Sequence, residues 1–202
     1  MRQTINIDVP TKWTDVSLKA YQNYCRAVED LTDEDELVFQ SISTLCNVPV
    51  DIVKKLRVND IKEIYERVGK LISIPVNKEV FDRIEMGGVT YGLHPNLDEL
   101  TMGEYIDLDE ACKEGIYGLQ GVLAILYRPI IKEAKNRYNI EVYDVKHLEN
   151  ARHFENISID VVNGLMLFFY NLGSKCLMSS QTFLEELERK NQPEETLNGL
   201  PS

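Results

Sequence analysis

Three carboxylates recur at every third position near the middle of the chain, at Glu104, Asp107 and Glu110. On a helix this spacing would place them along one slanted band, and oxygen ligands gathered in this way can bind Mg²⁺ or Ca²⁺. The neighbouring sequence has neither the Glu-x-x-His motifs of di-metal bundles nor the alternating ligands of an EF-hand. We therefore interpret the band as a solvated acidic surface or an electrostatic docking face. We predict no metal site and no cofactor, and keep a metal-dependent enzyme as an alternative.

The histidines are the second group that could perform chemistry, because imidazole titrates near neutral pH. They are His94, His147 and His153, and none of them forms a His-x-x-x-His or His-Glu-x-x-His motif. No nucleophile elbow, Walker loop or dinucleotide-binding glycine motif accompanies them. The sequence therefore predicts no catalytic residue and no enzymatic activity.

Basic residues are concentrated between positions 54 and 70, where the sequence contains six bases and three acids and therefore a local net charge of +3. Salt bridges along a helix surface would explain this pattern. A patch that docks against an acidic neighbour is the sharper alternative. The candidate docking residues are Lys54, Lys55, Arg57, Lys62, Arg67 and Lys70.

The whole chain is acidic, which limits its partners. Its 202 residues include 22 Lys and Arg against 33 Asp and Glu, a formal charge of −11, and 44% of them are hydrophobic. This composition is typical of a globular protein with a sizeable core, and its charge disfavours binding to nucleic acid through the bulk surface. We also expect no secretory signal, no membrane span and reduced cysteines, so we predict that the chain stays in the cytosol where it is made.

The first half of the chain is dominated by helical periodicity. Alternating apolar residues before Pro10 predict an extended N-terminal arm over residues 1–16. Ser17 is placed to cap a helix over residues 18–30, and Thr32 with Asp35 resembles a capping box for a helix that ends near Asn47. Two further helices are expected over residues 49–56 and 60–72. Residues 17–75 are thus predicted to form a small helical bundle.

The second half begins with a change of period. Two β-prone runs, 80–85 and 89–93, flank Gly87 and Gly88 and predict a β-hairpin. Thr101 and Glu104 then form a capping box for another helix. Glycines recur at positions 115, 118 and 121, where they either permit close packing of a neighbouring helix or mark a frayed helix start. Residues 130–143 are polar and mixed, and we interpret them as a loop or an excursion.

The strongest helical signal runs from residue 159 to about residue 190, after a cap at Ser158 and with a bend expected at Gly173. Its first half is apolar on nearly every side, which is typical of a central helix or of a subunit interface. The candidate interface residues are Leu165, Phe168, Phe169 and Tyr170. Residues 191–202, with two prolines, are predicted to form a C-terminal arm.

Together these patterns predict a mainly α fold, a helical bundle with one small β-hairpin and extended N- and C-terminal arms. The predicted parts are the arm at 1–16, the bundle at 17–75, the hairpin and helical domain at 76–190, and the arm at 191–202.

Four segments in order resemble a known family. They are residues 88–92 (GVTYG), 96–108 (NLDELTMGEYIDL), 124–129 (AILYRP) and 164–173 (GLMLFFYNLG). In this order they resemble virion structural and assembly proteins of tailed bacteriophages, especially crAss-like phages of Bacteroidetes hosts. The resemblance covers roughly residues 88–175 well and the N-terminal helices more loosely.

The resemblance implies a non-enzymatic virion component, a neck or portal-vertex ring subunit at the head–tail connector. Its expected partners are further copies of itself in a ring and other phage structural proteins, such as portal or tail components. A tail assembly chaperone, absent from the mature virion, is the alternative that it implies. It transfers no catalytic residue.

Overall fold

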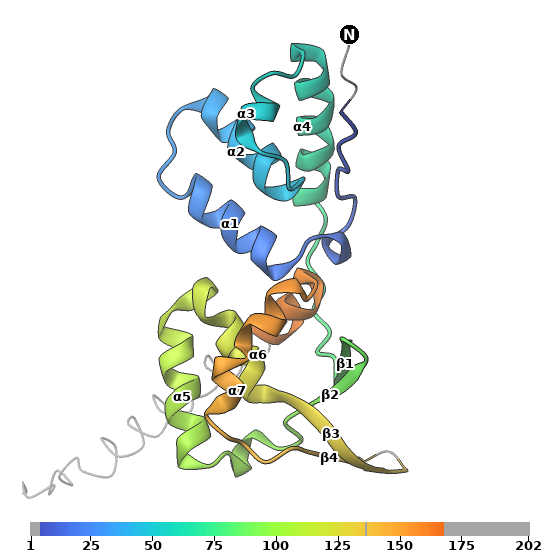
Figure 1. The fold of residues 1–202 in the computed structure, drawn as a ribbon, viewed down its shortest axis with the longest axis vertical. Coiled ribbons are helices and arrows are strands. Elements are labelled where there is room, and N and C mark those ends of the chain that lie inside the picture. Colours follow the sequence, from blue (N-terminus) through green and yellow to red (C-terminus); the bar gives the residue numbers. More distant parts are fainter. Residues whose placement is uncertain (1–4, 136, 168–202) are drawn as a thin grey trace, which may run out of the picture. The chain divides into compact units, whose positions relative to one another are not determined.

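The computed structural model describes residues 5–135 and 137–167 (Figure 1). The chain divides into two compact units, Met1–Leu165 and Met166–Ser202. The fold described below is that of the first unit, and residues 191–202, predicted as a C-terminal arm, lie outside the described residues.

The first unit contains a four-stranded antiparallel sheet, so the prediction of a mainly α bundle with one small hairpin is wrong. Its strands are β1 (Arg83–Met86), β2 (Val89–Leu93), β3 (Tyr127–Ala134) and β4 (Arg137–Ile140), hydrogen-bonded in the order β1-β2-β3-β4. The chain is therefore mixed α and β. The prediction failed because residues 131–134 of β3 are all exposed and do not alternate, and because β4, although it alternates, is only 4 residues long.

The predicted hairpin is confirmed as β1 and β2. Met86 pairs with Val89, and the two residues between them, Gly87 and Gly88, have φ angles of 57° and 77°. Two successive residues with positive φ define the tight turn that matches the twist of a hairpin, and glycine adopts them without steric strain.

The second hairpin, β3 and β4, was not predicted. Residues 127–129 of β3 pair with β2, whereas residues 130–134 pair with β4, with an irregularity between Ile130 and Lys132. Lys135 occupies the turn with a φ of 55°. The outer half of β3 therefore extends beyond the residues that pair with β2, and there it pairs with β4 (Figure 1).

Four helices precede the sheet: α1 (Leu18–Val28), α2 (Glu34–Leu45), α3 (Val50–Val53) and α4 (Val58–Ile72). Ser17 caps α1 by accepting a hydrogen bond from the Ala20 amide, as predicted. Asp33, rather than Thr32, caps α2 through the Glu36 amide at 2.8 Å. The predicted helices are confirmed, although the cap of α2 lies one residue further along.

The remaining elements follow the first hairpin. They are the 3₁₀ helices η2 (Leu97–Glu99), η3 (Gly115–Gly118) and η4 (Ala151–Asn156), the helices α5 (Met102–Lys113), α6 (Leu119–Leu126) and α7 (Lys146–Glu149), and a helix that begins at Ile159. The predicted capping box of α5 is present. Gly118 and Gly121 support the close-packing interpretation, because a Cβ at either would meet backbone or side-chain atoms of Ala111 in α5, whereas Gly115 has a φ of 58° and a Cβ there would meet no atom within 4 Å.

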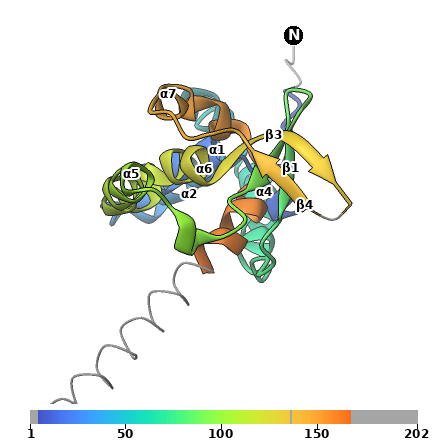
Figure 2. The same ribbon diagram turned by 90° about the horizontal axis from the view of Figure 1, so that it is seen from below.

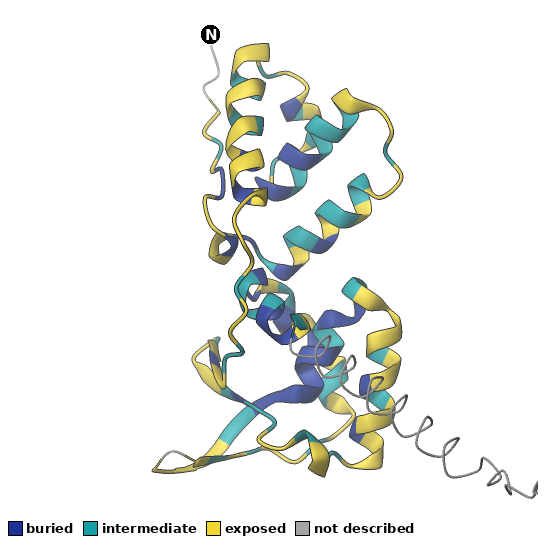
Figure 3. Cartoon of the chain, turned by 180° about the vertical axis from the view of Figure 1, so that it is seen from behind, coloured by how far each residue is buried: buried dark blue, intermediate teal, exposed yellow. Residues whose placement is uncertain are grey.

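The core of the unit is centred on α6, which is buried along most of its length (Figure 3). Residues 9–18 join this core instead of extending away from it, since Trp13, Val16 and Leu18 are buried and residues 13–15 form a short 3₁₀ helix, η1 (Trp13–Asp15). The Leu18 amide donates to the Ile157 carbonyl at 2.8 Å, and the Ile159 amide donates to the Val16 carbonyl at 2.9 Å. These bonds join the start of α1 to the start of the helix at 159.

Candidate functional site

The most completely buried ion pair among the described residues joins α5 to β3. Arg128 Nη2 lies 2.7 Å from Glu104 Oε1, and the two side chains are only 4% and 3% exposed. Arg128 lies opposite Gly92 of β2 in the sheet. The pair therefore links the start of a helix to a strand that is central to the sheet.

The second oxygen of Glu104 is used at the helix start. Glu104 Oε2 accepts hydrogen bonds from the backbone amide and from the hydroxyl of Thr101, both at 2.7 Å. Burial opposes ionisation of Glu104, but these bonds and the charge of Arg128 outweigh it and lower the pKa of the carboxyl. Glu104 is therefore a buried, ionised cap residue.

Arg128 also contacts Tyr143, which is itself hydrogen-bonded to α5. Its guanidinium lies 5.8 Å from the centre of the Tyr143 ring, and the Tyr143 hydroxyl donates to Asp107 Oδ2 at 2.6 Å. Burial lowers the pKa of Arg128, against the influence of Glu104. Within residues 5–135 and 137–167, Arg128 Nε is buried and has no hydrogen-bond partner.

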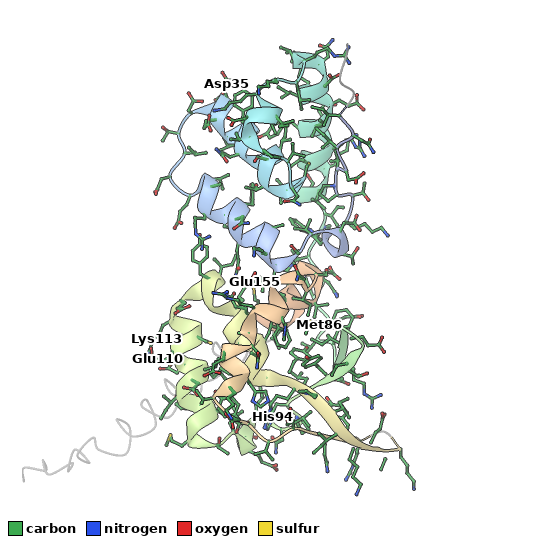
Figure 4. All side chains as sticks on the ribbon, viewed as in Figure 1. Asp35, Met86, His94, Glu110, Lys113 and Glu155 are labelled. Atoms are coloured by element: carbon green, nitrogen blue, oxygen red, sulfur yellow. The ribbon has the colours of Figure 1, made fainter. Side chains whose placement is uncertain are left out.

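His94 completes this cluster from the segment that joins β2 to η2 (Figure 4). Its Nε2 lies 3.9 Å from Glu104 Oε1, and its side chain is 10% exposed. Burial and the nearby charge of Arg128 lower the pKa of His94 and favour the neutral ring. The arrangement is that of a packed polar network that fixes α5 against the sheet.

The three carboxylates of the predicted band do not converge. Glu104 faces the core, Asp107 accepts from Tyr143, and Glu110 pairs with Lys113 at 2.8 Å on the outer side of α5 (Figure 4). Our interpretation of the band as solvated is wrong for Glu104. In the part of the chain that the structure describes, no group of three His, Cys, Asp or Glu side chains could hold a metal ion.

The other two histidines lie at a separate pocket of about 390 Å³ between the sheet, α7 and η4. His147 stacks on Tyr143 with 5.9 Å between the ring centres, and its Nε2 lies 3.5 Å from Glu141 Oε2. His153 lines the same pocket. Sequence reasoning treated the three histidines separately, and the structure brings two of them to one pocket.

The outer face of α5 exposes an apolar stripe. Met102, Tyr105 and Ile106 are 72%, 60% and 52% exposed, although they follow the i, i+3, i+4 spacing that usually marks a buried face. Exposed acids Asp109 and Glu110 continue this face along the helix. The spacing of these three residues is visible in the sequence and would normally indicate a buried face. In the structure, however, the buried face of α5 is formed by Glu104 and Leu108.

Two residues of the predicted basic docking patch are paired locally. Lys54 lies 2.9 Å from Glu36 of α2, and Arg57 pairs with Asp60 at 2.8 Å. The remaining four, Lys55, Lys62, Arg67 and Lys70, are exposed on or next to α4. Glu63 and Glu66, also exposed, alternate with them, so the structure supports the salt-bridged interpretation for part of this patch.

A second basic surface lies on the unpredicted hairpin. Lys132, Lys135 and Arg137 are exposed there, together with Ile131, which is 65% exposed. Within residues 5–135 and 137–167 none of these three bases pairs with a carboxylate, whereas the neighbouring Glu133 pairs with Arg83 at 2.7 Å. We call Ile131, Lys132, Lys135 and Arg137 the hairpin tip.

The predicted apolar interface is described only in part. Leu165 is 2% exposed and belongs to the core. Gly164 lies against the backbone of Glu79, where a Cβ would overlap the carbonyl oxygen. Phe168, Phe169 and Tyr170 lie outside the described residues.

Three of the four sequence segments quoted above, 88–92, 96–108 and 124–129, meet at the buried network. Residues 88–92 lie in the first hairpin, 96–108 include η2 and the first part of α5, and 124–129 join α6 to β3. Through Gly92, Glu104 and Arg128 they contribute the strand register and the ion pair. These motif residues thus form a framework for the fold.

Among the described residues, no helix combines the length and the apolar character needed to span a bilayer. The chain matches no protein-family model, no curated protein and no solved structure.

Proposed function

We propose that this chain is a non-enzymatic structural subunit of a tailed-phage virion, placed in a ring at the neck or portal vertex between head and tail. The observation that carries the proposal is the exposed apolar stripe of α5, Met102, Tyr105 and Ile106. Contiguous exposed apolar residues rimmed by charge are typical of protein–protein contact sites. The resemblance of the four segments to phage structural proteins supplies the kind of assembly.

The positions of the polar groups support an assembly role over a catalytic one. Glu104 caps α5 and pairs with Arg128, and His94 packs against the same pair. A catalytic acid or base must reach a substrate, and these groups instead hold helix to sheet. The stripe on α5 and the hairpin tip are exposed features of the described surface that suit contacts with protein.

Mass spectrometry of purified particles of the phage that encodes the chain tests the proposal. We expect the chain in mature virions at a fixed ratio to the portal protein, and retained after high-salt washing, with a non-structural phage protein as the negative control. A density map of the particle would then locate the ring. Presence in infected cells combined with absence from particles would overturn the proposal.

That same outcome would favour the tail assembly chaperone. A chaperone uses an exposed apolar surface to cover a partner before assembly and then leaves, and the stripe on α5 is compatible with this role. Co-purification with tail components from infected cells, but not from particles, would identify it.

A further inference from the structure

Two exposed surfaces of the first unit have opposite charge, and each includes at least one exposed apolar side chain. The stripe on α5 is surrounded by acids, since the segment 98–114 contains Asp98, Glu99, Asp109, Glu110 and Glu114 at exposed positions and a single base, Lys113. Lys113 pairs with both Asp109 and Glu110 at 2.8 Å. One cation therefore serves several carboxylates, and the surface keeps an excess of negative charge.

The hairpin tip offers the complementary surface. It carries the bases Lys132, Lys135 and Arg137 together with the exposed Ile131. The one acid of the tip segment, Glu133, is engaged by Arg83, whose guanidinium also lies 5.2 Å from the centre of the Tyr138 ring. The tip is held in place as well, because the Tyr138 hydroxyl lies 2.9 Å from the carbonyl oxygens of Asp82 and Leu93.

The two surfaces lie on opposite sides of the chain. Figures 1 and 2 show α5 on one side of the unit, whereas the end of β3 and β4 at their connecting turn points to the opposite side. One chain therefore cannot bring its hairpin tip onto its own α5. A contact between such surfaces is heterologous, and repeated contacts of this kind close into a ring when the rotation permits.

We propose that the hairpin tip of one copy docks on the exposed face of α5 of the next copy, with Ile131 against Met102, Tyr105 and Ile106 and the bases of the tip against Asp109 and Glu110. The partner of each subunit in the ring is then a second copy of this chain, and this inference rests on the proposed function. The apolar residues supply burial, and the opposite charges set the register and exclude wrong pairings.

Other ways of covering the α5 face fit the charges less well. A two-fold contact of α5 against α5 would bring acids against acids, which costs free energy. Docking of α5 on the 54–70 segment would meet Glu63 and Glu66 between its bases. The hairpin tip is the more uniformly basic of the two surfaces.

Sedimentation velocity of the purified full chain over a range of concentrations tests the contact. We expect wild-type protein to self-associate and to dissociate as salt is raised. Lys132→Glu with Arg137→Glu should weaken association by about tenfold or more, as should Asp109→Lys with Glu110→Lys. Mixing the two double variants should restore association, because the reversed charges then face each other again.

A matched control carries the same charge change elsewhere. Lys62→Glu with Lys70→Glu alters two exposed bases of α4, and we expect association to stay at the wild-type level. Circular dichroism confirms that each variant is folded. A monomeric wild type at its highest soluble concentration, an equal loss in the α4 control, or no restoration on mixing would each overturn the contact.

Cross-linking gives a second readout that does not depend on charge. Cys112 is exposed on α5, so a short bis-maleimide should join it to the thiol introduced by Lys135→Cys in a neighbouring copy. Peptide mapping should find this link between chains, and Cys112→Ser should remove it. Cross-linked dimers that map to other cysteines would contradict the proposed register.

The contact and the virion role can fail separately. A chain that is present in particles but does not associate through these surfaces would keep the proposed function and lose the contact. A chain that associates with restoration on mixing but is absent from particles would keep the contact and lose the virion role.

Discussion

Glu104 and Arg128 form an ion pair at 2.7 Å between the first turn of α5 and the first residues of β3, with both side chains nearly inaccessible to water. Removing one partner of such a buried pair lowers the free energy of unfolding more than removing both partners. The charge left behind cannot be solvated when one partner is removed. This asymmetry makes the role of the pair measurable.

Glu104→Gln should lower the free energy of unfolding by about 3–5 kcal/mol, because it leaves the Arg128 charge buried and uncompensated. Chemical denaturation measures the loss. Glu110→Gln, which removes an exposed carboxylate of the same helix, is the control and should change stability little. A similar small effect for both variants would mean that the buried pair does not hold the fold.

The double variant Glu104→Gln with Arg128→Met should be less destabilised than the sum of the two single variants. Neither uncompensated charge then remains in the core, and residues in direct contact are expected to couple. Additive losses in a double-mutant cycle would contradict the coupling.

Stability should fall in acid through His94 and Glu104. Both groups have a pKa below the ordinary value in the folded chain, so the unfolded chain takes up protons more readily and acid favours unfolding. The contribution of His94 is fully present above its ordinary pKa of 6.5 and is lost as pH falls through its folded pKa. The contribution of Glu104 is lost likewise below 4.5.

Urea denaturation from about pH 8 to about pH 5 isolates the histidine. His94→Gln should flatten the decline of stability over this range. His153→Gln, at an exposed position, should leave the decline unchanged. An identical pH profile for wild type and His94→Gln would show that His94 does not contribute to it.

Gly164→Ala should destabilise the protein by about 1–3 kcal/mol, because the added methyl group overlaps the Glu79 carbonyl oxygen. Gly69→Ala is the matched variant within α4, where a Cβ meets no atom within 4 Å. It should stabilise the helix by about 0.5–1 kcal/mol. Thermal unfolding of the two variants should therefore shift in opposite directions, and a shared direction would argue against the close approach at Gly164.

Tyr127→Phe should cost about 1–3 kcal/mol, since the Tyr127 hydroxyl donates to the Phe81 carbonyl at 2.6 Å and its loss leaves that acceptor without this partner. Tyr105→Phe removes a hydroxyl from an exposed ring and should be neutral. Equal melting temperatures for wild type and Tyr127→Phe would contradict the importance of this bond.

Local signals in the sequence predicted the local elements correctly. Ser17 and the pair Thr101 and Glu104 cap helices where expected, and Gly87 with Gly88 forms the expected turn. In each case the residues that determine the conformation are neighbours in the chain, so their pattern is visible without tertiary contacts.

The second hairpin could not be predicted in the same way. Pro129 argues against a central strand because it has no amide hydrogen, yet its carbonyl accepts from the Glu141 amide at 2.9 Å and it lies opposite Tyr91 in the sheet. Two isoleucines follow it, and residues 131–134 are all exposed and show no alternation. Only long-range pairing defines this strand.

The buried network also has one part that the local sequence predicts and one part that depends on long-range contacts. The sequence identified Glu104 as a cap residue, which is a local role. Its burial depends on Arg128, a contact across the fold that spacing alone does not show. The exposed stripe on α5 was overlooked for the complementary reason, since apolar residues at helical spacing are normally assigned to a core.

Helix α6 ends at Leu126 and β3 begins at Tyr127, so no linker separates this buried helix from the strand that carries the hairpin tip. The helix and the second hairpin are thus continuous in the chain, and the buried Arg128 lies next to the junction between them. A contact made at the hairpin tip is therefore continuous with the buried helix through the chain itself, with no loop between them.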